Sequence, residues 1–286
     1  MNAVHNSYPP PLSIGRPLVT IIVPLLNAAP YIAGCIRSVL DQSWDNWELL
    51  LVDNGSSDGS RAIAASFTDP RIILMDEPRK GVSFARNMGL AHMKGTYFCF
   101  LDADDLLPKN SIRLRLDLFR RYPEARFADG AMEAFDANTG KVKWVRSPWN
   151  HGNPFDAMML MDGSSFAGNT WMVKRVTGHE YRMPEHMDHS EDHAFYLGIS
   201  RQGLYVSTAR VVLHYRTGHV SANSDPLNGH TGYLELYKWM GQLKPPPSET
   251  QLQHAWNRLR RFMVRDLLKR GHFIDALRVR QRARPR

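Results

Sequence analysis

The chain has 286 residues and a formal net charge of +8, and 43% of its residues are hydrophobic. This composition supports a large core, and two cysteines, Cys35 and Cys99, exclude a disulfide framework and favour a reducing, cytoplasmic compartment. No apolar run reaches the length of a membrane span, and residues 1–17, which include Pro9-Pro10-Pro11, predict a disordered lead-in and no signal peptide.

Apolar segments that predict strands alternate with segments that predict helices. Helical spacing is clearest over 32–40, and further helices are expected after Asp58-Gly59-Ser60, over 82–93, over 111–121 and over 191–201. Strands are expected at 18–25, 48–53, 71–75, 96–101, 127–131 and 204–213. This alternation predicts an α/β fold with a mainly parallel central sheet and helices on both faces.

The fourth predicted strand ends in the sequence Phe98-Cys99-Phe100-Leu101-Asp102-Ala103-Asp104-Asp105. Ligands of open α/β sheets bind at the carboxyl ends of strands, so the acids are expected in a binding site. Asp102 and Asp104 alternate with Ala103 and can face one ligand, and carboxylates shared with phosphate oxygens suit Mg²⁺ or Mn²⁺. The alternative is an acidic start to the next helix, a role that remains open for Asp105.

Three further blocks accompany this motif, and together the four resemble the family 2 glycosyltransferases of GT-A fold. They are the first strand with its end, 19–27, the turn Asp53-Asn54-Gly55-Ser56 after the second strand, and the segment Gly81 to Gly89. The resemblance covers about residues 18–223. It implies a nucleotide-sugar-binding half over 18–131 and an acceptor-binding half over 132–242.

The resemblance also implies roles for individual residues on the donor side. Asp53 is expected to accept a hydrogen bond from a uracil N3–H or a ribose hydroxyl. Arg86 could reach the diphosphate, hold the acidic cluster, or be a surface arginine. Asp104 is expected to bind the metal. The full set of expected donor-binding residues is Pro24, Leu25, Asn27, Asp53, Gly81, Arg86, Asp102 and Ala103.

The catalytic base is expected in Ser190-Glu191-Asp192-His193, which resembles the Glu-Asp motif of the family. Asp192 matches the position of the base, and Glu191 stands beside it. The alternative is an acidic first helical turn stabilised by the helix dipole. His214 and His219 follow the last predicted strand, and either could bind the metal, with His219 preferred.

These assignments predict an inverting, metal-dependent hexosyltransferase that moves a sugar from a UDP-linked donor to a hydroxyl of a glycan or lipid-linked acceptor. A nucleotidyltransferase would need a Gly-rich, Lys-containing loop after the first strand, where the sequence has Leu25-Leu26-Asn27-Ala28. A non-catalytic nucleotide-sugar-binding protein is the other alternative. No nucleic-acid partner is expected, because no recognition module is present.

Positive charge gathers at the C-terminal end, where residues 243–286 predict a Pro-rich linker followed by basic amphipathic helices. Residues 251–286 hold eleven Arg or Lys and two acids, so the rest of the chain is almost neutral. Trp256, Phe262 and Met263 belong to an apolar stripe flanked by arginines, which suits docking on an anionic membrane surface. The stripe could equally pack on the catalytic body with the arginines in solvent.

Overall fold

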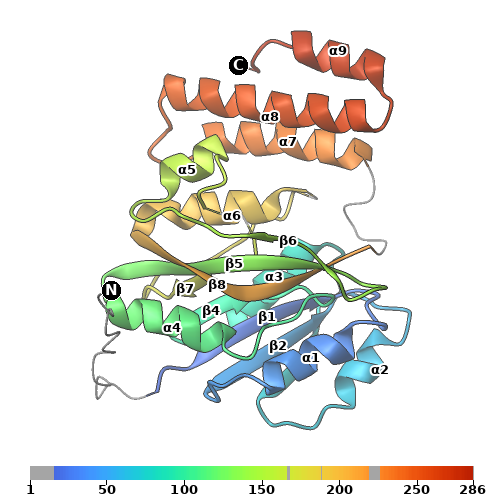
Figure 1. The fold of residues 1–286 in the computed structure, drawn as a ribbon, viewed down its shortest axis with the longest axis vertical. Coiled ribbons are helices and arrows are strands. Elements are labelled where there is room, and N and C mark those ends of the chain that lie inside the picture. The colour runs from blue at the N-terminus through green and yellow to red at the C-terminus, as the bar shows by residue number, and fades with distance from the viewer. Residues whose placement is uncertain (1–15, 166–167, 188, 219–225, 286) are drawn as a thin grey trace, which may run out of the picture.

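A computed structural model describes residues 16–165, 168–187, 189–218 and 226–285. One eight-stranded sheet crosses the molecule in the order β3-β2-β1-β4-β7-β5-β6, with β8 paired to β5 (Figure 1). The strands are β1 (Val19–Leu25), β2 (Trp47–Asp53), β3 (Ile72–Asp76), β4 (Tyr97–Phe100), β5 (Ala125–Asp136), β6 (Val142–Arg146), β7 (Met172–Lys174) and β8 (Leu204–Thr217).

The first four strands form the parallel half of the sheet. The strand β7 runs antiparallel to both β4 and β5, β6 is antiparallel to β5, and β8 is parallel to β5. The predicted α/β architecture with a mainly parallel sheet is therefore confirmed. Each antiparallel strand pair of the sheet includes β6 or β7, and both of these strands follow the acidic motif in the sequence.

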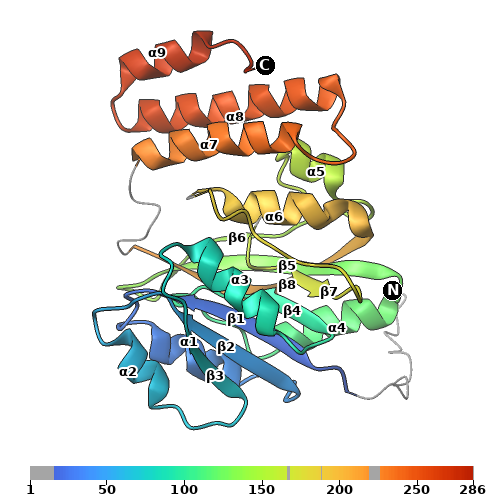
Figure 2. The same cartoon turned by 180° about the vertical axis from the view of Figure 1, so that it is seen from behind.

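Helices cover both faces because both faces of the inner strands are apolar. Along β1, Val19, Ile21 and Val23 join the core under α1, α2 and α4, whereas Ile22 joins the core under α3, α5 and α6. Figures 1 and 2 show these two helical layers from opposite sides. Their helices are α1 (Ile32–Leu40), α2 (Ser60–Ala65), α3 (Val82–His92), α4 (Ser111–Arg121), α5 (Phe155–Leu160) and α6 (Glu191–Ile199).

Gly89 lets α3 lie very close to β1. A Cβ atom at Gly89 would stand 2.4 Å from Cγ2 of Ile22, far inside van der Waals contact. This close approach explains the second glycine of the Gly81 to Gly89 block. It also sets the position of Arg86, one turn earlier on α3, relative to the carboxyl end of the parallel strands.

Three C-terminal helices form a further layer outside α5 and α6 (Figure 1). They are α7 (Pro226–Gly241), α8 (Glu249–Lys269) and α9 (Phe273–Gln281). Trp256 and Met263 of α8 are buried in the same core cluster as Met158 of α5 and Phe195 of α6. The buried side of the predicted apolar stripe therefore packs on the body of the protein.

Replacing Trp256 by Ala should strongly destabilise the whole protein. Its side chain is 1% exposed, so truncation leaves a large cavity and should lower the free energy of unfolding by about 3–5 kcal/mol. Urea denaturation measures this loss. Phe273→Ala is the matched control, because Phe273 is 63% exposed and its removal should change stability by less than ~0.5 kcal/mol. Equal effects of the two substitutions would contradict the packing of α8.

Candidate active site

The ends of β1, β2 and β4 meet at the carboxyl edge of the parallel half-sheet. Leu25 is paired with Asp53, and the next residue, Asn54, donates its backbone N–H to the carbonyl of Leu25 at 2.8 Å. On the other side of β1, Leu101 donates its N–H to Ile22 at 3.0 Å, and Asp102 follows directly. The two acidic segments separated by about fifty residues in the sequence thus lie at one edge.

Asp102, Asp104 and Asp105 form an acidic cluster at this edge. One carboxylate oxygen from each lies within 4.8 Å of the others, and among the described residues this is a group of acids able to hold a metal ion. Burial raises the pKa of Asp105 well above its usual range, and the neighbouring charges of Asp102 and Asp104 raise it further. Ala103 is buried, and the acids lie in a turn after β4, where Asp105 donates its backbone N–H to the carbonyl of Asp102 at 3.0 Å.

Arg216 of β8 fixes the acidic loop from the far side. Its backbone N–H donates to Oδ1 of Asp105 at 2.8 Å, and its Nε donates to the carbonyl of Asp104 at 2.7 Å. The guanidinium lies over the rings of Tyr31 and Phe135. Asp105 therefore binds β8 and does not cap α4, whose N-cap position is Asn110. The sequence alone predicted no role for Arg216, which lies between His214 and His219.

Arg86 connects the acidic cluster to α6. Its two terminal nitrogens donate to Oδ1 of Asp102 at 2.8 Å and to Oε1 of Glu191 at 2.9 Å. The Arg86 side chain is only 5% exposed, so it holds acids in place and does not project from the surface. Of the three alternatives left open by the sequence, this geometry agrees with holding the acidic cluster.

Glu191 should make the protein less stable as the pH rises. Burial, and then the charge of Asp192, raise the pKa of Glu191 to about 7 despite the opposing effect of Arg86. An unfolded glutamate has a pKa of about 4.3, so between these values the folded state binds more protons and loses stability with increasing pH.

Urea midpoints measured between pH 4 and 8 for the wild type and Glu191→Gln should show this loss. The wild type should fall relative to the variant across the window from about 4.3 to about 7. Glu180→Gln, at an exposed glutamate, controls for the loss of a charge. A constant difference between wild type and Glu191→Gln over the whole window would contradict the assignment.

Asp192 is more accessible than its neighbour. It is half-buried, and its Oδ1 accepts the backbone N–H of His193 at 2.6 Å in the first turn of α6. His193 itself is buried, with Nε2 2.9 Å from the carbonyl of Met158. In this turn Asp192 is therefore partly accessible, whereas Glu191 and His193 are buried.

The expected donor side is built around Asp53, Asn27 and Asn54. Both oxygens of Asp53 accept the N–H of Ser56 at 3.4 Å, and Oδ1 of Asn27 accepts the N–H of Ser57 at 2.9 Å. The Asn54 amide donates to the carbonyls of Glu77 and Arg79 and accepts from Gly81 at 2.8 Å. Asn54 therefore ties the turn after β2 to the start of α3.

The backbone of Gly81 and the burial of Leu25 limit which groups on the donor side can contact a ligand. Gly81 has φ of 132°, a backbone angle that favours glycine. Leu25 is fully buried, so only its backbone is available to a ligand, whereas Pro24 is half-buried. Contacts of Pro24, Leu25 and Gly81 with the donor remain predictions.

The two histidines expected near the metal differ in what the structure shows. Nδ1 of His214 lies 3.0 Å from Oε1 of Glu133 on β5, and His214 is not part of the acidic cluster. Its backbone pairs with Leu106 just after the acids. His219 lies outside the described residues. The acidic cluster therefore provides the candidate metal ligands without a contribution from His214.

Comparison with known proteins identifies the family of the chain. Residues 20–174 match the family described as Glycosyl transferase family 2. The chain belongs to this family. An uncharacterized glycosyltransferase of Haemophilus influenzae is 31% identical over 231 residues, which cover 78% of this chain and 89% of that protein.

A second relative of this family 2 glycosyltransferase is WfgD of Escherichia coli, a UDP-Glc:alpha-D-GlcNAc-diphosphoundecaprenol beta-1,3-glucosyltransferase. It is 41% identical over 129 residues, which span 45% of this chain and about half (51%) of WfgD. Among solved structures, the mannosyltransferase PcManGT from Pyrobaculum calidifontis, in complex with GDP-Man and Mn²⁺, has a TM-score of 0.61 at 18% identity. That match covers 94% of this chain and 77% of PcManGT, and it confirms the GT-A fold. Within the described residues, no helix is long and apolar enough to cross a membrane.

Proposed function

We propose that the protein is an inverting glycosyltransferase that transfers a hexose from a UDP-linked donor to a hydroxyl of a glycan or lipid-linked acceptor. The observation that carries the proposal is the bridge through Arg86 between Asp102 and Glu191. It joins the acidic strand end expected to bind the donor to the helix expected to bear the base. The UDP preference is supported by the relative WfgD, whose donor is UDP-Glc. It is also supported by Asp53, whose carboxylate can accept a hydrogen bond from uracil N3–H.

The acidic cluster fits a divalent metal ion. Three carboxylates with oxygens within 4.8 Å of one another repel one another. Burial raises the pKa of Asp105, and the charges of Asp102 and Asp104 raise it further. Oxygen ligands of this kind suit Mg²⁺ or Mn²⁺, and the neighbour PcManGT was solved with Mn²⁺. Asp104, with Asp102 and Asp105, would hold the ion, which when bound supplies positive charge beside the leaving diphosphate.

Asp192 is proposed as the general base. A carboxylate in the first turn of α6 can take the proton of an acceptor hydroxyl as that oxygen attacks the anomeric carbon from the face opposite the diphosphate. Attack from the opposite face inverts the anomeric configuration. Glu191 is proposed as a positioning residue, because its carboxylate is bound to Arg86 and 12% exposed.

The acceptor is proposed to reach Asp192 at the start of α6, where Asp192 is half-buried while its neighbours Glu191 and His193 are buried. We place the reaction in the cytoplasm, where the buried free thiols of Cys35 and Cys99 would stay reduced, and at a membrane surface when the acceptor is lipid-linked.

A thermal-shift screen of nucleotide sugars tests the donor class. A UDP-sugar with Mn²⁺ at a hundred times its Kd should stabilise the fold by about 2.7 kcal/mol, whereas GDP-sugars should have a much smaller effect. Asp53→Ala should remove the preference for uracil. Equal shifts with UDP- and GDP-linked sugars would contradict the proposed donor.

A further inference from the structure

The helix α9 presents an apolar face that the described part of the chain leaves exposed. Ala276 and Val279 of α9 are buried against α8, but Phe273, Ile274 and Leu277 are 63%, 68% and 57% exposed. Leu277 follows Phe273 by four positions and Ile274 by three, so these side chains lie on the same side of α9. Leu268 at the end of α8 is also exposed, at 46%. A patch of this kind on a surface usually marks an interaction site.

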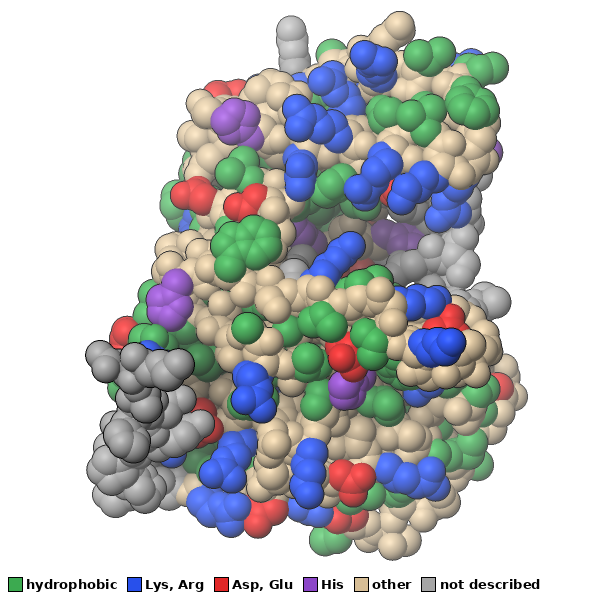
Figure 3. Space-filling model, viewed as in Figure 1, with side chains coloured by type: hydrophobic (Ala, Val, Ile, Leu, Met, Phe, Trp, Pro, Cys, Tyr) green, Lys and Arg blue, Asp and Glu red, His purple; other side chains and the backbone are tan. Residues whose placement is uncertain are grey.

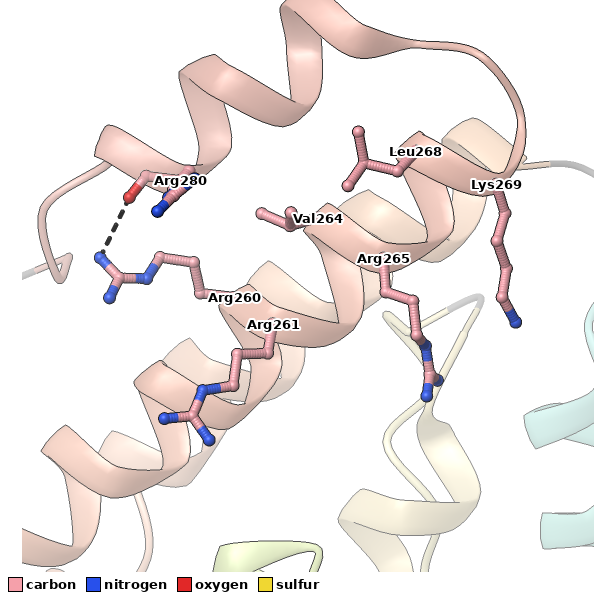
Figure 4. Close-up of a pocket in the computed structure, with 7 residues that line it drawn as sticks. All are labelled: Arg260, Arg261, Val264, Arg265, Leu268, Lys269 and Arg280. Carbon is pink, nitrogen blue, oxygen red and sulfur yellow. Dashed lines mark hydrogen bonds between the residues drawn. The ribbon is translucent and has the colours of Figure 1, made fainter.

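Cationic side chains line a groove that includes Leu268 of this patch. This groove of about 490 Å³ runs between α8 and α9, with Val264 and Leu268 directed into it (Figure 4). Arg260, Arg261 and Lys269 of α8 and Arg280 of α9 line the same groove. Figure 3 shows Lys and Arg side chains gathered with hydrophobic ones over this end of the molecule. Apolar side chains beside a groove with several cations are complementary to an anionic amphiphile.

We propose that the α8–α9 face, defined by Leu268, Phe273, Ile274, Leu277 and the groove cations, docks the protein on a bilayer that contains anionic phospholipids. The exposed apolar side chains enter the interface between headgroups and acyl chains, while Arg261 and Lys269 bind lipid phosphates. This face differs from the one expected from the sequence, because Trp256 and Met263 point into the core.

The charge balance favours this partner over a second copy of the chain. Residues 251–286 hold eleven bases and two acids, so two such faces would repel each other, whereas an anionic bilayer attracts them. The proposal adds a location to the proposed transfer reaction and does not depend on its chemistry. Vesicle binding needs neither donor nor acceptor, so its failure would leave the transferase proposal intact.

Flotation of the full-length protein with vesicles tests the proposal. At low salt it should bind an equimolar mixture of phosphatidylglycerol and phosphatidylcholine and ignore phosphatidylcholine alone, and binding should weaken as salt is added. Arg261→Gln and Lys269→Gln should each reduce the partition coefficient roughly fivefold. Ile274→Ser/Leu277→Ser should reduce it at least as much as either cation variant.

Matched controls use exposed residues away from the face. Arg113→Gln/Arg121→Gln on α4 removes two exposed cations, and Val142→Ser/Val145→Ser on β6 removes two valines that are 54% and 50% exposed. Neither should change vesicle binding. The proposal is overturned if the wild type ignores anionic vesicles, or if the controls lose binding as much as the α8–α9 variants. It is also overturned if Ile274→Ser/Leu277→Ser dissociates an oligomer in sedimentation velocity without changing vesicle binding.

Discussion

Asp104→Asn should abolish glycosyl transfer while the protein remains folded. The substitution removes one of three carboxylates that lie together at the end of β4, and with it the charge expected to hold the metal beside the diphosphate. The loss of transition-state stabilisation should be about 3 kcal/mol or more, which is the range for removing a key electrostatic group. Fewer like charges near Asp105 should leave stability unchanged or slightly raised.

The measurement is kcat/KM with saturating Mn²⁺, together with a urea denaturation curve. Asp117→Asn on α4 is the control, since it removes the same charge at a surface ion pair with Arg120. Chelation of the metal from the wild type should reproduce the loss. An Asp104→Asn enzyme with full activity, or a wild type that works equally well in excess EDTA, would refute the metal role.

Asp192→Asn should lower kcat by about 10²–10⁴-fold, the contribution typical of a general base. Donor affinity should stay near that of the wild type, because Asp192 is proposed to act on the acceptor. Steady-state kinetics with the donor varied separates the two parameters. Normal turnover with weakened donor binding would show that Asp192 belongs to the donor site.

Glu191→Gln distinguishes the two acids of α6. Its amide oxygen can still accept from Arg86, so the contact between α3 and α6 survives and the loss of kcat should be smaller than for Asp192→Asn. A greater loss in Glu191→Gln would transfer the role of base to Glu191. Arg86→Met is a harsher test of the same bridge, because it leaves the buried carboxylate of Glu191 without its cation.

The parallel half of the fold and its acids were predictable because each depends on local sequence. The apolar runs of β1, β2 and β4 identify strands buried on both faces, and the acids that end β2 and β4 must then share one edge. The resemblance to family 2 glycosyltransferases rested on those same segments, and the family match over residues 20–174 confirms it.

Other parts of the site depend on contacts that a single sequence does not encode locally. Arg86 and Glu191 are 105 positions apart, and Arg216 reaches the acids from a strand more than a hundred positions away. The apolar stripe of α8 was compatible with a membrane or with the body. Only the placement of α5 and α6 beneath it shows that Trp256 is buried and that α9 carries the exposed face.

The most direct test of metal-dependent inverting transfer is the slow hydrolysis of an α-configured UDP-hexose, with water as acceptor, followed by proton NMR. The account predicts that the sugar first released is the β anomer, that release requires Mn²⁺ or Mg²⁺, and that Asp104→Asn and Asp192→Asn both suppress it. An α anomer released first, or release at the same rate in EDTA, would contradict it.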